Sequence, residues 1–205
     1  MILRIVQYGD PILRHKGDPV CPPDTALKSL ANDMLETLKE NNGLGLAAQQ
    51  IGRALQLCVV DLSCLKADSI DFSFTYDGKK PPLALCMPLF ILNPKLTRLR
   101  SPRKVVGEGC LSFPNLYLPV KRPHAIHLEF QDLEGTAHTL ECDGLFARVI
   151  QHEVDHLQGI LYIDRLARLK PEERVQLKGE LATLERRNRR KEGTSSAQPP
   201  QHKRS

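Results

Sequence analysis

The first regular pattern of apolar and polar positions in the chain is a helical one. From Asp24 to Asn42, apolar residues recur at intervals of three and four, which places them along one side of a helix. Asp24 or Thr25 can accept hydrogen bonds from the free amides at the helix start, and Gly43 suits its end. The spacing therefore predicts an amphipathic helix that packs one face against a core.

Several later segments have the apolar patterns of strands. Residues 55–61 and 90–99 are rich in aliphatic side chains, and residues 125–132 alternate apolar and polar positions. Residues 137–143 follow after a short connection that contains Gly135, so they are expected to form a hairpin with the preceding strand. These patterns predict a sheet built largely of antiparallel strands.

The C-terminal part of the chain returns to helical patterns. One helix is expected to follow Gly144, and another to begin near Pro171, because proline is favoured at the first helical position. Strands followed by helices indicate an α+β fold with mostly antiparallel sheets, an N-terminal helix and a C-terminal helix. A chain of this length can bury one core, so we expect a single domain over residues 1–185.

Two segments lack a regular pattern. Residues 63–87 include the sequence DGKKPP, and we interpret them as an inserted surface loop and the most mobile part of the domain. Residues 186–205 are polar and basic, which predicts a disordered C-terminal tail.

Composition restricts the cellular context. No apolar run approaches the roughly 18 residues that a membrane span needs. The first residues contain Asp10 and Pro11 and resemble neither a signal peptide nor a transit peptide. The six cysteines form no CxxC pair, so reduced thiols are expected. These features predict a protein of the cytoplasm without a membrane partner.

The net charge of +5 is unevenly distributed. Residues 186–205 contain seven basic residues and one acidic residue, a charge of +6, so the rest of the chain has a charge of −1. The folded part therefore has no broad polycationic face, and we expect no DNA partner.

The most informative chemical motif is the sequence IQHEVDH. His152 and His156 are four residues apart, so on a helix both imidazoles point to the same side and can bind one metal ion. Glu153 lies beside them and can act as a base on metal-bound water. The alternative interpretation is a charged, solvated helix that happens to contain histidines.

A catalytic metal site requires a third protein ligand. The only histidine downstream of the motif is His202, in the predicted tail, whereas Cys110 lies upstream in the glycine-rich segment GEGCLSFP. A cysteine thiolate is a good ligand for zinc and for iron. The alternative for Cys110 is a small buried apolar side chain, which is the usual state of a cysteine.

The segment NNGLGLAAQQIG, residues 41–52, follows the first helix. Its small residues suit a wall against which an extended peptide could pair, and its glutamines can donate hydrogen bonds to an oxyanion. Tight turns or close packing would also explain the glycines.

Together, the segments GLGLAAQQ, EGCLS and QHEVDH resemble the three motifs of peptide deformylases. The resemblance extends from the N-terminal strand and first helix to about Asp164. It implies a fold built around a central metal-binding HExxH helix. It also implies hydrolytic removal of the formyl group from N-formylmethionyl nascent peptides, with release of formate.

The resemblance also implies a role for individual residues. Cys110, His152 and His156 match the metal ligands, and Glu153 matches the general acid and base. Gln50 and the backbone amide of Leu111 match the groups that stabilise the oxyanion. The residues that match substrate-binding positions are Gly43, Leu44, Gly45, Gly109, Leu145 and Val149. Arg148 departs from the family pattern, in which an apolar residue is often found.

The same resemblance implies one divalent metal ion, natively Fe(II), for which Zn(II) or Ni(II) can substitute. Two other functions are compatible with parts of the pattern. One is a zinc endopeptidase with an HExxH helix, and the other is a non-catalytic relative that associates with ribosomes. The basic sequence ERRNRRK also suggests that the C-terminal helix and tail contact ribosomal RNA.

Overall fold

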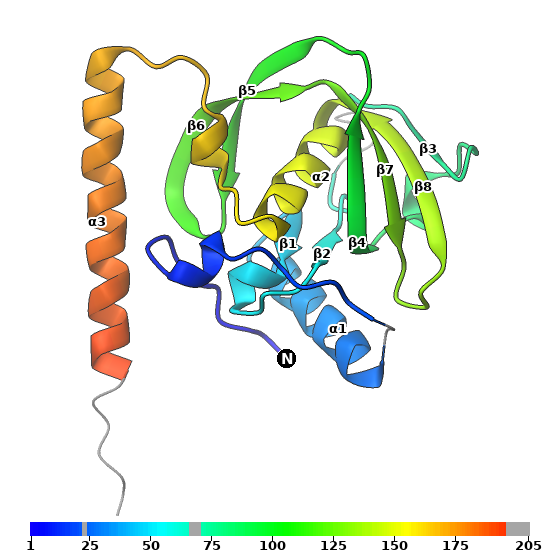
Figure 1. The fold of residues 1–205 in the computed structure, drawn as a ribbon, viewed down its shortest axis with the longest axis horizontal. Coiled ribbons are helices and arrows are strands. Elements are labelled where there is room, and N and C mark those ends of the chain that lie inside the picture. The colour runs from blue at the N-terminus through cyan, green and yellow to red at the C-terminus, as the bar shows by residue number, and fades with distance from the viewer. Residues whose placement is uncertain (22–23, 66–70, 196–205) are drawn as a thin grey trace, which may run out of the picture.

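The computed structural model describes residues 1–21, 24–65 and 71–195 (Figure 1). Its larger sheet has six strands, and every neighbouring pair in it is antiparallel. In spatial order these are β1 (Gly45–Ala47), β2 (Leu57–Val60), β4 (Leu89–Arg98), β7 (Ala125–Gln131), β8 (Ala137–Asp143) and β3 (Phe74–Tyr76). The predicted α+β class and the predicted hairpin of β7 with β8 are confirmed.

A second sheet consists of two strands, β5 (Arg103–Cys110) and β6 (Phe113–Pro123). They pair antiparallel along most of their length and are joined by a turn at Leu111 and Ser112. Cys110 is therefore the last residue of β5, at the closed end of this hairpin.

Helix α2 (Gly144–Leu157) lies between the six-stranded sheet and the β5–β6 hairpin (Figure 1). Eleven of its fourteen residues are buried. Phe146, Ile150 and Leu157 pack in the main core cluster with side chains of β2, β4, β7 and β8. Because the helix is covered on nearly all sides, each polar group on it must find a partner inside the protein.

Helix α1 (Thr25–Glu40) covers β1 and β2. Ala31, Met34 and Leu38 are fully buried in a second cluster with aliphatic side chains of these strands. Asp24 caps the helix, because its Oδ1 accepts a hydrogen bond of 2.7 Å from the Leu27 amide. The predicted N-terminal helix and its cap are confirmed.

Helix α3 (Pro171–Ser195) stands at the edge of the molecule, on the side of β5 and β6 (Figure 1). Leu177 and Leu181 belong to a third cluster, which also contains Phe113 and Tyr162. In the part of the chain that the structure describes, no helix is long and apolar enough to cross a membrane.

Helix α3 continues to Ser195, ten residues beyond the predicted boundary at residue 185 between the domain and a disordered tail. Arginine, lysine and glutamate have high helix propensity, so the helix persists where its apolar stripe ends. The remainder of the predicted tail, residues 196–205, lies outside the described residues.

Two short elements lie within residues 63–87, the predicted inserted surface loop. Residues 74–76 form β3, which pairs with β8, and Leu83–Leu85 form a short 3-10 helix. Phe74 and Tyr76 pack against the main core, which explains why this short strand is ordered at the sheet edge. Residues 66–70 lie outside the described part of the chain.

The N-terminal segment is not the strand that the sequence suggested, because residues 1–7 have no regular secondary structure. It instead links two of the motif segments. The Val6 amide donates a hydrogen bond of 2.8 Å to the Gln50 carbonyl, and the Tyr8 amide donates one of 2.9 Å to the Ser112 carbonyl. The segment therefore holds the residue 41–52 region beside the β5–β6 turn.

Candidate metal centre

Three side chains from two elements converge in the space between α2 and the β5–β6 hairpin. Ligand atoms of Cys110, His152 and His156 all lie within 4.8 Å of one another. Cys110 Sγ is 3.3 Å from His156 Nε2, and the two imidazole centroids are 5.0 Å apart. This spacing suits a single cation with three protein ligands and a further open position.

The order of the elements explains this convergence. His152 and His156 lie one turn apart on α2, whose apolar residues fix its rotation against the core. Cys110 is brought opposite them because β5 ends at the hairpin turn that the N-terminal segment ties down.

Glu108 orients the first histidine. One of its carboxylate oxygens lies 3.0 Å from His152 Nδ1, and the Arg122 Nε donates to the other over 2.7 Å. Burial alone would raise the pKa of Glu108, but the hydrogen bonds from His152 and Arg122 lower it to about 2. An ionised acceptor at Nδ1 fixes the tautomer that leaves Nε2 free to bind a metal.

Arg122 extends this network along α2. Its Nη1 donates a hydrogen bond of 2.7 Å to Asp155, which also accepts one of 2.9 Å from Arg165 Nη2. The carboxylates of Glu108 and Asp155 therefore share one buried guanidinium, which connects β5, β6 and α2.

His156 is 1% exposed, and its Nδ1 has no hydrogen-bond partner among the described residues. Burial lowers the pKa of His156 well below its ordinary value. The ring is therefore neutral, which is the form in which imidazole binds a metal.

Glu153 is 3% exposed, and within the described part of the chain its Oε2 has no hydrogen-bond partner. Burial raises the pKa of Glu153 to about 7. The carboxylate lies directly against Gly45, where an added Cβ would be 2.7 Å from Glu153 Cγ and Cδ. A buried carboxylate with a free oxygen beside three ligand atoms fits a group that exchanges protons with a metal-activated water.

Gln50 contacts Cys110 and is 1% exposed. Its Oε1 accepts a hydrogen bond of 2.8 Å from the Ala47 amide, which fixes the orientation of the side-chain amide. Its Nε2 is then 3.4 Å from both Cys110 Sγ and Ser112 Oγ. This nitrogen is a donor at the edge of the three-ligand cluster.

A cavity of about 660 Å³ opens onto this centre. The substrate-binding residues predicted from the sequence all line it: Gly43, Leu44, Gly45, Gly109, Leu145 and Val149. Gln50, Leu111, Cys110, His152 and Glu153 also line it, whereas His156 does not. The structure thus brings the predicted site residues together around this cavity, and His156 reaches the metal centre without lining the cavity.

Sequence reasoning missed three residues of this centre. Glu108 and Arg122 were not singled out, and neither was Ser112, which is fully buried beside Gln50. Glu108 lies two residues before Cys110, but the register of β5 against β6 is irregular between them, so simple strand alternation does not indicate it. Nothing in the sequence indicates that Arg122 is buried.

A cysteine sulfur, two imidazoles and a buried carboxylate at an open cavity are typical of a metal-dependent hydrolase of the HExxH class. The model of the polypeptide deformylase family matches residues 2–172, and the chain belongs to this family. Its members are metal-dependent enzymes that remove the N-formyl group from nascent peptides, and this chain is such a hydrolase.

Individual relatives agree with this assignment. A curated peptide deformylase of Opitutus terrae is 56% identical over 167 residues, which cover 81% of this chain and 85% of the relative. The crystal structure of the peptide deformylase from Thermus thermophilus is 37% identical and has a TM-score of 0.73. This comparison covers 91% of this chain and 99% of the other.

A peptide deformylase from Synechococcus elongatus, solved in complex with actinonin, is 34% identical and has a TM-score of 0.72. This comparison covers 89% of this chain and 85% of the Synechococcus chain. The similarity therefore includes almost the whole described domain and not only the three motif segments.

Proposed function

We propose that Cys110, His152 and His156 hold one divalent cation, at which this chain hydrolyses the formyl amide of N-formylmethionyl peptides. The observation that carries this proposal is the convergence of three ligand atoms within 4.8 Å beside the unpartnered oxygen of Glu153. Such a cation supplies Lewis acidity, which makes a water molecule a stronger nucleophile and polarises the formyl carbonyl.

The residues around the cation move and stabilise charge in this reaction. Glu153 accepts a proton from the attacking water as the water oxygen bonds to the formyl carbon. Gln50 Nε2 and the Leu111 amide donate hydrogen bonds to the developing oxyanion. The carbon–nitrogen bond then breaks, Glu153 returns the proton to the leaving amine, and formate is released.

The cavity provides the means to hold the peptide. We propose that the backbone of Leu44 and Gly45 pairs with the extended substrate, since β1 is the edge strand of its sheet on this side. Gly43, Leu145 and Val149 then receive the methionine side chain, and Gly109 allows the peptide to approach the metal.

For the native cation we propose Fe(II), with Zn(II) or Ni(II) as substitutes. The Cys/His/His set combines a soft thiolate with two imidazoles, and this combination suits all three metals. Metal analysis of protein purified without oxygen identifies the ion. The same preparation should release formate from a formyl-Met peptide, and a chelator should abolish this activity.

Substitution of single residues tests the assigned roles. Cys110→Ala is expected to lose bound metal, whereas Glu153→Ala is expected to keep it and lose formate release by a factor of about 100 or more. Cys142→Ala is the control, because it removes a thiol on β8 that is not among the three proposed ligands. Retention of metal by Cys110→Ala, or near-normal turnover by Glu153→Ala, would refute the corresponding role.

We further propose that the basic end of α3 contacts ribosomal RNA in the cytoplasm, where formylated nascent chains are made. The helix presents four exposed arginines beyond its apolar stripe: Arg186, Arg187, Arg189 and Arg190. Contacts with phosphates weaken steeply as salt increases. Replacing the four arginines by glutamine should abolish salt-sensitive co-sedimentation with ribosomes, whereas Arg174→Gln with Lys178→Gln should not.

A further inference from the structure

Arg148 is a buried cation on α2 that takes no part in the reaction as derived above. It is 8% exposed and lies one turn before His152, beside the cavity. A guanidinium is costly to bury, so its hydrogen-bond partners identify what it does in the fold.

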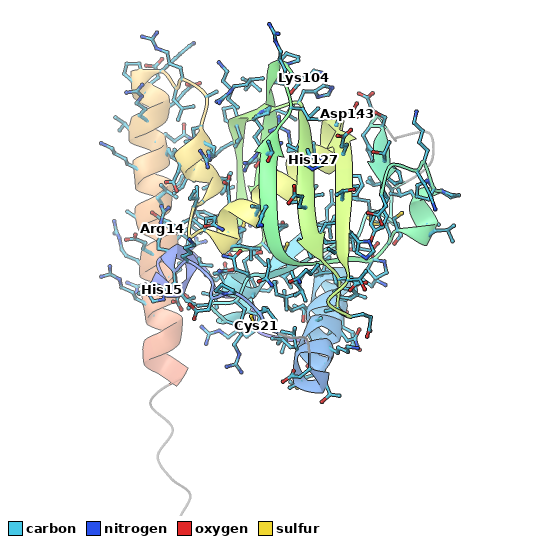
Figure 2. The ribbon with its side chains drawn as sticks, turned by 45° about the vertical axis from the view of Figure 1, so that its right-hand side comes forward. Arg14, His15, Cys21, Lys104, His127 and Asp143 are labelled. Carbon is cyan, nitrogen blue, oxygen red and sulfur yellow. The ribbon has the colours of Figure 1, made fainter. Side chains whose placement is uncertain are left out.

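The guanidinium of Arg148 joins three separate segments. Its Nη1 donates hydrogen bonds to Glu108 Oε1 over 2.6 Å and to the Val120 carbonyl over 3.1 Å. Its Nη2 donates to the Lys104 carbonyl over 3.0 Å. Lys104 lies near the start of β5, at the top of the view in Figure 2, and Val120 lies on β6. One side chain of α2 therefore binds both strands of the hairpin that ends at Cys110.

The contact with Glu108 completes the environment of that carboxylate. Oε1 of Glu108 accepts from Arg122 and Arg148, and Oε2 accepts from Arg122 and lies 3.0 Å from His152 Nδ1. With two donors at each oxygen, the carboxylate cannot rotate without breaking a short, charge-assisted hydrogen bond. Because His152 Nδ1 lies 3.0 Å from this carboxylate, fixing the carboxylate also fixes the direction of His152 Nε2.

We propose that Arg148 is a positioning residue that holds the β5–β6 hairpin and Glu108 against α2, and so keeps the Cys110 thiolate and the His152 ring at the separation that retains the cation. This inference rests on the proposed metal set of Cys110, His152 and His156. In this inference, Arg148 holds the hairpin in place, a task that neither the three ligands nor Glu153 performs.

The test is the rate at which a chelator removes the metal from the purified holoenzyme. Arg148→Met keeps an unbranched apolar stem and removes every donor, and it should lose metal about tenfold faster than the unsubstituted protein. Arg148→Lys keeps the charge but cannot reach three acceptors at once, so its rate should lie between the two.

Gln151→Met is the matched control. Gln151 is also buried on α2, and its Nε2 donates a hydrogen bond of 3.0 Å to the Pro123 carbonyl of β6. Among the described residues it makes no hydrogen bond with Glu108. This variant should keep the metal-loss rate of the unsubstituted protein. Equal acceleration by Gln151→Met and Arg148→Met would show that Arg148 is only a packing residue, and would overturn the inference.

A double-mutant cycle tests whether Arg148 acts through Glu108. In a Glu108→Gln background, Arg148→Met should change the metal-loss rate by clearly less than tenfold, because the charged acceptor is gone and only the contacts with the Lys104 and Val120 carbonyls remain to be lost. A full tenfold effect in that background contradicts the proposal. The absorption spectrum of the Co(II)-loaded protein gives a second readout, because it reports ligand geometry and should change in Arg148→Met but not in Gln151→Met.

These measurements separate this inference from the proposed function. If the unsubstituted protein binds no metal, or if Cys110→Ala binds it normally, the proposed metal set is wrong. If the metal set stands and Arg148→Met loses metal at the normal rate with an unchanged Co(II) spectrum, only the role of Arg148 is wrong.

Discussion

Gly45 and Glu153 are packed so closely that the residue type at position 45 determines whether the Glu153 side chain fits. Gly45 is in β1 and Glu153 is in α2, and the carboxylate occupies the space that a side chain at position 45 would fill. The absence of a Cβ at Gly45 is therefore a requirement of the buried Glu153 carboxylate and not of the local backbone, whose φ is ordinary.

Gly45→Ala is expected to displace the carboxylate of Glu153 while leaving Cys110 and the two histidines in place. Formate release should fall at least about tenfold, because misplacement of a catalytic group by about 1 Å is costly, but bound metal should stay stoichiometric. The control is Gly179→Ala on α3, where an added Cβ meets no atom within 4 Å. Normal turnover by Gly45→Ala would show that the contact has no catalytic consequence.

Among individual residues, the sequence predicted those whose spacing in the chain forms a recognisable motif. His152 and His156 are four apart on a helix, and Cys110 was found by resemblance and by its glycine-rich surroundings. Glu108 and Arg122 were not found, because their importance depends on pairing between a strand and a helix that are distant in sequence. Arg148 was noticed only as a departure, and its partners on β5 and β6 required the structure.

At the scale of elements, the turn after β3 is attached to the β7–β8 hairpin through His138. Nδ1 of this imidazole is 2.8 Å from Asp77 in that turn, and Nε2 is 3.2 Å from Asp132. Tyr76 and Phe130 pack near the ring. Burial would lower the pKa of His138, but the two carboxylates outweigh it and raise the pKa above its ordinary value of 6.5.

The sign of the pH dependence follows from these shifts. A raised pKa for His138 contributes stability that is complete below pH 6.5 and is lost as the pH rises through the folded-state value. The pKa values of Asp77 and Asp132 are lowered from 3.8, so their contribution is lost as the pH falls through the folded-state values. The contacts of His138 with Asp77 and Asp132 therefore stabilise the protein most at pH values above the lowered pKa values of the two aspartates and below the raised pKa of His138.

His138→Gln should reduce the free energy of unfolding by roughly 0.5–1 kcal/mol at about pH 5.5, after allowance for solvent screening of these partly exposed groups. The difference from the unsubstituted protein should shrink at about pH 9, where the imidazole is neutral. Urea unfolding at the two pH values measures it, with the exposed His15→Gln as the control histidine. A difference that is equal at both pH values contradicts a charged His138.

Elements with their own apolar periodicity were predicted well, and those that depend on a partner were not. Helix α1 has a full stripe and a capping aspartate, so its range could be predicted. Strand β3 has three residues and exists because β8 provides its hydrogen-bond partners. The last turns of α3 lack an apolar face, and only helix propensity indicates them.

At the scale of the whole molecule, the proposed cation connects the hairpin to the central helix. Cys110 and His156 are 46 positions apart in the chain but adjacent in the fold. An ion that binds only the folded protein stabilises it in proportion to the logarithm of its concentration relative to Kd. Removing it therefore lowers the stability of the entire domain.

Thermal unfolding with and without metal tests this connection. Saturation with Zn(II) at about 100 times its Kd should raise Tm by on the order of 5–10 °C for a domain of this size. Glu153→Ala should show the same increase, because it keeps the three ligands, and Cys110→Ala should show none. An equal increase in Cys110→Ala would mean that the ion binds elsewhere.

The separation of the thiol from the imidazoles along the chain has a consequence for how the enzyme is made. Synthesis proceeds from the N-terminus, so Cys110 is made before any residue of α2. During that interval the thiol has no imidazole neighbours and must stay reduced on its own. Loading with metal therefore belongs to the final stage of biogenesis, and a nascent chain cannot deformylate itself before α2 has emerged and folded.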